Sequence, residues 1–260
     1  MKFNRLLLIS ATCCLSLTAC GGGGGGGDSA ATTSSVSTDS SAEGAYVGTL
    51  SGSSNTAFQM LVLDDGTFWT LYGVQQSGMF YVNGFVQGQG SFANGKFSST
   101  NAKDFGYSPA MAGSVNGTYT SSPSISGTVT SKAGSVSFSG APDPASTYNY
   151  QQAATISTIA GVWNMTVLTG ETVSLNVSNT GALGGVSSAG CAYSGTVTPR
   201  ASGKNVYDVK LQFGASPCAL PGQVATGIAV AYAVDGGKTQ LVVAAVDSTR
   251  TYGVAALASR

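Results

Sequence analysis

The sequence contains no histidine and few charged side chains. Charged residues make up 8% of the 260 residues, well below the ~25% that is usual for globular proteins. The absence of histidine removes the commonest general base, the Ser-His-Asp and Cys-His arrangements and most zinc sites. The chain also has no run of lysine or arginine to neutralise phosphates, which excludes nucleic acid as a partner. We therefore predict a protein that is not an enzyme, with no catalytic residues, no metal and no cofactor.

The few acidic residues fall mostly in predicted turns. Asp64-Asp65-Gly66 has the beginning of a calcium-binding loop, but no glutamate follows at the spacing that such a loop needs, so a hairpin turn is favoured. A glycosidase would need two carboxylates in one cleft, and no pattern in the sequence places two of them together. An enzyme is therefore the least favoured hypothesis.

The apolar run near the N-terminus is too short for a membrane-spanning helix, which needs ~20 residues. This mainly apolar stretch of twelve residues, 6–17, follows Lys2 and Arg5 and ends in Leu17-Thr18-Ala19-Cys20. A basic start, a short apolar centre and small residues before the cleavage point form the layout of a secretory signal. We predict that residues 1–19 are a signal peptide.

The Leu-Thr-Ala-Cys ending resembles the bacterial lipobox. The resemblance implies that Cys20 carries fatty acyl chains such as palmitate and becomes the mature N-terminus, and two or three such chains anchor a protein firmly to a membrane. Bacterial lipoproteins of the inner membrane commonly have aspartate after this cysteine, so Gly21 implies the outer membrane. An ordinary cleaved signal with a free Cys20 is the alternative.

The segment after Cys20 is rich in glycine and serine. Residues 21–27 are seven consecutive glycines, and Val36 is the single large apolar residue up to Ser41. Such a segment cannot bury enough surface to fold. We predict that residues 20–43 are a disordered tether that lifts the folded part off the membrane.

From residue 44 onward the chain reads as short strands separated by turns. Asp65-Gly66 and Asn94-Gly95 lie between apolar runs and predict β-hairpins. Residues 207–213 alternate between apolar and polar, and helical periodicity is nearly absent. Pro142-Asp143-Pro144 marks a break. We predict an all-β fold of two tandem antiparallel β-barrels, lipocalin-like or up-and-down, at residues 44–145 and 146–260, because closure removes exposed edges. A sandwich is the alternative.

The layout as a whole resembles the two-barrel surface lipoproteins of Gram-negative bacteria, of the transferrin-binding and factor-H-binding type. The resemblance lies in the lipobox cysteine Cys20, the glycine tether, the tandem β domains and the Gly-aromatic strand openings at Tyr46 and Trp163. It implies a lipid-anchored protein of the outer membrane or cell surface, not catalytic, that binds a host protein or a small ligand through its β domains. A structural or assembly lipoprotein that contacts other envelope proteins is the alternative.

Two cysteines remain outside the leader and the lipobox. Cys191 and Cys218 are an even pair in an oxidising compartment, and their spacing is not that of a CxxC motif. We predict a disulfide between them.

The first predicted domain is rich in aromatic residues. Residues 44–150 contain sixteen phenylalanines, tyrosines and tryptophans, whereas residues 151–260 contain six. Adjacent rings in a strand point to opposite faces, so Phe68-Trp69 and Phe80-Tyr81 each place one ring outside. Exposed aromatic surface often marks binding. We predict a ligand-binding surface on this domain, with cover by the other domain or by loops as the alternative; the candidate residues are Trp69, Tyr72, Tyr81 and Phe85.

The last strands of the second domain are apolar on both faces. In residues 228–234 and 241–246 both alternating sets of side chains are apolar. A barrel strand needs only one buried face. We predict that the outer face packs on the first domain or on a partner.

Overall fold

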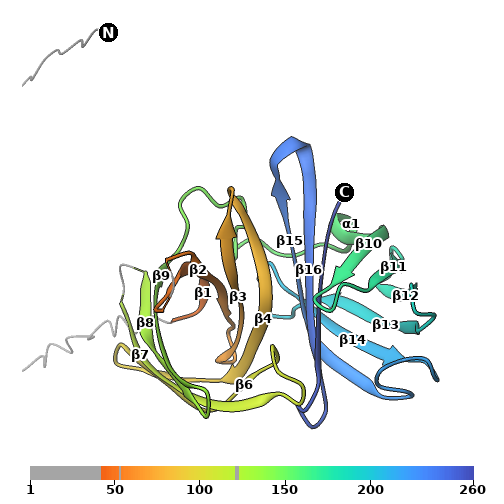
Figure 1. Ribbon diagram of the computed structural model, residues 1–260. Helices are drawn as coiled ribbons and strands as arrows, with labels where there is room; N and C mark the ends of the chain where they lie inside the picture. The colour runs from red at the N-terminus through yellow and green to blue at the C-terminus, as the bar shows by residue number, and fades with distance from the viewer. Residues whose placement is uncertain (1–41, 53, 121–122) are drawn as a thin grey trace, which may run out of the picture. The chain divides into compact units, whose positions relative to one another are not determined.

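The computed structural model describes residues 42–52, 54–120 and 123–260 (Figure 1). The predicted signal peptide, Cys20 and the tether up to residue 41 lie outside the described residues. The predicted fold class is confirmed, because the strands form two closed antiparallel barrels of eight strands each, one after the other along the chain. Both barrels belong to the same compact unit of the chain. Among the described residues no helix is long and apolar enough to cross a membrane.

The first barrel is a meander that closes on itself. Strand β1 pairs with both β2 and β9, and β4 pairs with β6, while the short β5 only extends the edge beside β6. In Figure 1 these strands run from orange to green. Their bounds are β1 (Gly44–Leu50), β2 (Thr56–Val62), β3 (Thr67–Gln76), β4 (Met79–Gln89), β5 (Ser91–Ala93), β6 (Lys96–Asp104), β7 (Met111–Thr120), β8 (Ser124–Ser131) and β9 (Gly134–Ala141).

Both hairpins expected from turn residues are present. Between β2 and β3, the Thr67 N–H donates to Asp65 Oδ1 at 2.8 Å, and Gly66 has a φ of 78°. Between β5 and β6, Asn94 and Gly95 have φ values of 52° and 73°, as a tight hairpin turn with left-handed central residues requires. The Asp64-Asp65-Gly66 segment is therefore a turn of the hairpin type.

The second barrel is a simple up-and-down meander in which β10 pairs with both β11 and β17. A single-turn helix leads into it. In Figure 1 its strands run from green to blue. The elements are α1 (Ile156–Ile159), β10 (Gly161–Val167), β11 (Thr172–Val177), β12 (Ala182–Ser187), β13 (Ala192–Pro199), β14 (Tyr207–Phe213), β15 (Val224–Val234), η1 (Asp235–Gly237), β16 (Lys238–Asp247) and β17 (Gly253–Ser259).

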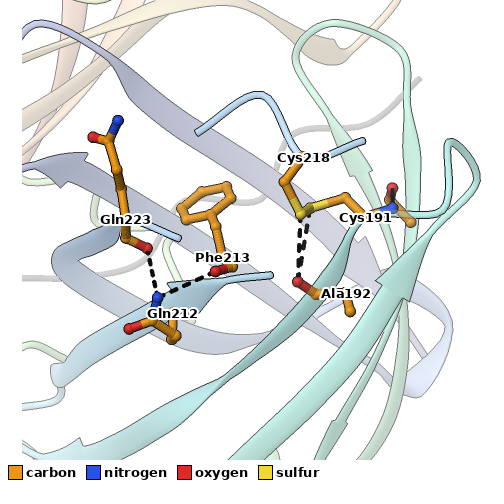
Figure 2. The surroundings of a disulfide bond; sticks show 7 residues. Cys191, Ala192, Gln212, Phe213, Cys218 and Gln223 are labelled. Carbon is orange, nitrogen blue, oxygen red and sulfur yellow. Dashed lines mark hydrogen bonds between the residues drawn. A yellow bond between two sulfur atoms is a disulfide. The ribbon is translucent and has the colours of Figure 1, made fainter. Parts of the chain in front are cut away.

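A disulfide joins Cys191 and Cys218, as predicted (Figure 2). It ties the start of β13 to the loop between β14 and β15. Both sulfur atoms lie near the carbonyl oxygen of Ala192, at 3.7 and 3.6 Å; these are contacts rather than hydrogen bonds, because a disulfide sulfur has no proton to donate. Closing a loop with a sequence separation of 27 residues restricts the unfolded chain, an effect of about 3 kcal/mol in the chain-entropy account.

The outer faces of the two barrels pack on each other. Leu61, Trp69 and Phe85 from β2–β4 belong to the same buried cluster as Ile228 and Ala244 from β15 and β16. The inner-face residues of β15–β17 belong to a separate cluster inside the second barrel. The prediction that the last strands bury both faces is therefore confirmed, and the cover is the first barrel.

Three aromatic rings of the first barrel form a stack at this interface. The ring of Phe85 lies between those of Trp69 and Phe105, with centroid separations of 6.1 and 4.7 Å. The opposing surface includes the small residues Ala244, Ala255 and Gly253, and a Cβ atom built on Gly253 would lie 2.6 Å from both Phe85 Cζ and Phe105 Cδ1. The Phe85 and Phe105 rings therefore pack directly against the backbone of Gly253, at the start of β17.

Arginines fix the interface at its polar rim. The Arg200 guanidinium donates to Asp64, Asp65 and Asp208 at 2.6, 2.7 and 2.8 Å. Burial acts to lower the pKa of Arg200, but the carboxylates outweigh it and raise the pKa. Two of these carboxylates come from the first barrel, so the ion pairs cross the interface. The Arg250 side chain crosses it as well, and donates to the Gln87 side chain at 2.6 Å.

The turn that carries Arg250 is organised by Asp247. Its Oδ1 accepts the N–H groups of Thr251 and Tyr252 at 2.8 and 2.6 Å, and its Oδ2 accepts the N–H of Thr249 at 3.1 Å. Burial acts to raise the pKa of Asp247, but these hydrogen bonds outweigh it, and the net pKa lies below the usual value.

Two residues of the predicted tether pack on the barrels. The Tyr46 hydroxyl donates to the carbonyl of buried Ala42 at 2.9 Å. Glu43 accepts a hydrogen bond from the Tyr150 hydroxyl at 3.0 Å and pairs with Lys204 at 3.4 Å. Ala42 and Glu43, the first two described residues, thus both contact the barrels.

Replacing Gly253 tests the seat of the aromatic stack. Phe85 is 1% exposed and held between two rings, so it cannot move away from an added methyl group. We expect Gly253→Ala to lower the free energy of unfolding by about 1–3 kcal/mol, as overpacking does. Gly184→Ala is the matched control, since its Cβ would lie 3.8 Å from the nearest atom, Tyr193 O. Urea denaturation measures both, and equal stability of the two variants would contradict the proposed packing.

Candidate functional site

The first barrel contains a cavity of about 210 Å³ that is open to solvent. Its walls are mainly apolar and include the rings of Phe58, Phe68, Phe97 and Phe138. Residues at the end of β6, the start of β7 and the β8–β9 hairpin also line it, which places it toward that end of the barrel. Eight-stranded barrels either fill with side chains or hold one small ligand, and this one has room for a ligand.

The two barrels differ in how their interiors are filled. The core cluster of the second barrel contains twenty-four buried apolar residues, whereas that of the first contains twelve. Small residues leave space in the wall of the first barrel, among them Ala102, Gly113, Ala133 and Gly134. The cavity therefore follows from the composition of these strands.

One polar pair lies in this apolar wall. The Tyr72 hydroxyl on β3 donates to Asp104 Oδ1 at the end of β6, at 2.7 Å, and the Gly106 N–H donates to the same oxygen at 2.8 Å. Within the part of the chain that the structure describes, Asp104 Oδ2 accepts no hydrogen bond. The carboxylate is thus fixed through one oxygen while the other has no protein partner.

Two glycines make the space for the Tyr72 hydroxyl. A Cβ on Gly84 would lie 2.4 Å from this oxygen, and one on Gly106 would lie 2.0 Å from it. The β3–β4 register also shifts between Tyr72 and Gly73, an irregularity of the kind that redirects a side chain. The local sequence therefore positions the pair specifically.

The charge on Asp104 is not balanced by a basic side chain. Among the ion pairs of the described residues none involves Asp104. Its neighbour Lys103 donates instead to the carbonyls of Arg250 and Thr249, at 2.7 and 3.1 Å. Burial raises the pKa of Asp104, and the hydrogen bonds from Gly106 and Tyr72 offset this only in part. Burial and the bond to Asp104 also raise the pKa of Tyr72.

The structure separates the four aromatic residues proposed for binding. Tyr72 lines the cavity. Trp69 and Phe85 are 8% and 1% exposed and stack at the barrel interface, so cover by the other domain, the alternative considered above, applies to these two. Tyr81 is 45% exposed on β4, away from the other three. The alternation of Phe68 and Trp69 is as expected, with Phe68 inside the barrel and Trp69 outside.

Trp69 and Phe85 also line a crevice of about 380 Å³ between the barrels, together with the linker residue Tyr148 and with Tyr232 of β15. This crevice has apolar walls, and its rim includes Asp143 and Asp235. It lacks a polar pair comparable to that of Tyr72 and Asp104 at its centre. The cavity of the first barrel is the better candidate site.

Sequence reasoning missed Asp104. Most acidic residues were assigned to turns, and Asp104-Phe105-Gly106 does make a turn, because Asp104 accepts the Gly106 N–H. The available signal was the position of an acid at the end of a strand whose other inward residues are apolar or small. Among the described residues no group of three or more histidine, cysteine, aspartate or glutamate side chains could hold a metal ion.

Comparisons with known proteins leave the family open. No protein-family profile matches the chain. No curated protein matches its sequence. Isotype 1 transferrin binding protein B from serogroup B Neisseria meningitidis is 9% identical, with a TM-score of 0.26, over 79% of this chain and 66% of that chain. A protein of unknown function of the DUF3598 family from Nostoc punctiforme is 13% identical, with a TM-score of 0.25, over 84% of this chain and 93% of that chain. Likenesses this weak carry no argument about function.

The dependence of stability on pH tests the environment of Asp104. Because its pKa is raised in the folded state, the native protein binds more protons than the unfolded chain between the usual pKa, about 4, and the folded value. The contribution of Asp104 to wild-type stability should therefore fall as pH rises through this window. Asp104→Asn keeps an acceptor for Tyr72 and Gly106 but has no charge, so its stability relative to wild type should increase with pH.

Urea denaturation of both proteins between about pH 3 and pH 7 measures this difference. Asp235→Asn, at the exposed β15–β16 turn, controls for the loss of one carboxylate. If Asp104→Asn instead loses stability relative to wild type as pH rises, the carboxylate stabilises the fold, and its role is structural.

Proposed function

We propose that this protein is a non-catalytic binding protein, anchored to the outer membrane by lipid at Cys20, that holds a small and mainly apolar ligand in its first barrel. The observation that carries the proposal is the cavity of about 210 Å³, with apolar walls and one fixed polar pair. Apolar walls with a few placed polar groups are the usual composition of a small-molecule site.

The size of the cavity limits the ligand. Ligand pockets usually measure about 300–1,000 Å³, so a cavity of about 210 Å³ suits a molecule smaller than a typical drug. The rings of Phe58, Phe97 and Phe138 offer flat apolar contact on several sides. The Tyr72–Asp104 pair supplies orientation, because an apolar surface alone does not fix direction.

The proposal of a non-catalytic role rests on the chemistry of the same pair. Asp104 is paired with a tyrosine whose pKa is raised, and the chain has no histidine to act with it as a base. Such a pair can donate and accept hydrogen bonds, which serves recognition. The filled second barrel then acts as a support for the first.

Capture of an extracellular or envelope protein is a second candidate function. Met79 and Tyr81 at the β3–β4 hairpin are 55% and 45% exposed, and aromatic residues are enriched in protein interfaces. Tyr81 was proposed for binding from the sequence, and it remains available for this role. Display on the cell surface would favour a host protein, whereas a periplasmic location would favour an assembly role in the envelope.

The anchor is tested by replacing the proposed acylated residue. We expect Cys20→Ser to move the protein from the membrane fraction to the soluble fraction, or to leave it with its leader uncleaved, because acyl chains supply the membrane affinity. Membrane fractionation and mass spectrometry of the N-terminus measure both effects. An unmodified Cys20 thiol in protein extracted from membranes would refute the anchor.

The cavity is tested by filling it. N-phenyl-1-naphthylamine is a neutral apolar dye that fluoresces on leaving water, and we expect it to bind the Cys20→Ser protein, in which no acyl chain or detergent competes. Val129→Phe adds a ring to the cavity wall and should weaken dye binding by roughly tenfold or more, about 1.4 kcal/mol. Val186→Phe, at a position that is 51% exposed on β12, is the control and should bind as wild type does. Equal binding by both variants, with folding verified by circular dichroism, would place the dye elsewhere.

A further inference from the structure

We propose that the ligand of the first barrel is a small apolar amine whose ammonium group pairs with Asp104 Oδ2. This inference rests on the proposed function, because it requires that the cavity bind a ligand. The inference specifies the charge and the polar group of the ligand, which the proposed function leaves open. The observation behind it is a carboxylate in an apolar cavity with one oxygen fixed by the protein and the other without a protein partner.

The arrangement around Asp104 orients one oxygen toward a donor from outside the protein. Oδ1 accepts both protein donors, the Tyr72 hydroxyl at 2.7 Å and the Gly106 N–H at 2.8 Å. These two bonds fix the carboxyl group. The Asp104 side chain is partly buried, and a carboxylate that is partly removed from water is stabilised by a donor or a cation. A ligand ammonium at Oδ2 would supply both.

The two basic residues Lys103 and Arg250 near Asp104 have their side chains bound elsewhere. Lys103 is adjacent to Asp104 and lines the same cavity, yet its Nζ donates to the carbonyls of Thr249 and Arg250 across the barrel interface. Arg250, the next cation in that region, donates to Gln87 and to the Asn101 carbonyl. Since no ion pair among the described residues involves Asp104, a ligand ammonium would supply its countercharge.

The aromatic walls suit a cation with an apolar body. Tyr72 and Tyr107 line the cavity together with four phenylalanine rings, and aromatic faces attract ammonium groups. An anionic ligand would meet the uncompensated Asp104 in the same apolar space. A metal ion would need further ligands, and among the described residues Asp104 belongs to no group of three suitable side chains.

A matched series of three ligands tests the inference. The probes are 4-phenylbutylamine, 4-phenylbutanol and 4-phenylbutyrate, which share the apolar body and differ in charge. Isothermal titration calorimetry with the Cys20→Ser protein at pH 7 measures their affinities. We expect the amine to bind at least about tenfold more tightly than the alcohol, because a hydrogen bond to a charged group exceeds a neutral one. The acid should bind most weakly.

Asp104→Asn is the deciding variant, and Asp235→Asn is its control. In Asp104→Asn the preference for the amine over the alcohol should disappear while the alcohol keeps its affinity, which also shows that the cavity is intact. Asp235→Asn should keep the full preference. Should Asp104→Asn not fold, Asp104→Ser, which also removes the charge, should lose the preference for the amine, and a retained preference would contradict the inference.

The outcomes separate the two proposals. If wild type binds none of the three probes and no apolar dye, the proposed function fails. If it binds the dye or the alcohol but shows no preference for the amine, or if Asp104→Asn keeps that preference, the inference is wrong and the proposed function stands.

Discussion

The packing of one barrel wall on the other is the constraint on which the rest of this structure depends. The outer face of β2–β4 carries large rings, and the opposing strand β17 begins with Gly253, so Phe85 and Phe105 reach the backbone there. Burying a large apolar side chain contributes about 1.5–3 kcal/mol, and several are buried here. Because these rings are committed to the interface, the surface aromatics of the first barrel are a poor guide to ligand binding. The residues that face the lumen must be considered instead.

Several of the few charged residues hold the two barrels together or fix the start of the first barrel. Arg200 connects the barrels through Asp64 and Asp65, and Lys204 with Glu43 fastens the start of the first barrel. An isolated surface ion pair contributes little to stability. The Arg200 guanidinium, however, is 14% exposed and pairs with three carboxylates, and such a partly buried network contributes more than a single surface pair. Asp104 is partly buried and has no basic partner among the described residues, and it differs from buried Asp247, whose two carboxylate oxygens both accept hydrogen bonds from the protein, in that one of its oxygens accepts none.

Local sequence patterns were sufficient to predict the fold, whereas the candidate site depends on contacts between residues that are far apart in the sequence. Asp65-Gly66 and Asn94-Gly95 encode their hairpins within a few residues, and the alternation in residues 241–246 showed that both faces would be buried. Alternation alone does not say which face is inside, however, so Trp69 could not be assigned to the interface. Asp104 meets Tyr72 across a sequence separation of 32, through a closure between β4 and β6 that no local signal encodes.

The interface also explains how one barrel can be hollow. A cavity in a protein core lowers stability in proportion to its volume, because the lining atoms lose contacts. The first barrel has half as many residues in its core cluster as the second. Its outer wall, however, is covered by the second barrel, whose filled interior and disulfide make a firm support. Stability is thus supplied in part from outside the first barrel, which leaves room in its lumen for a cavity.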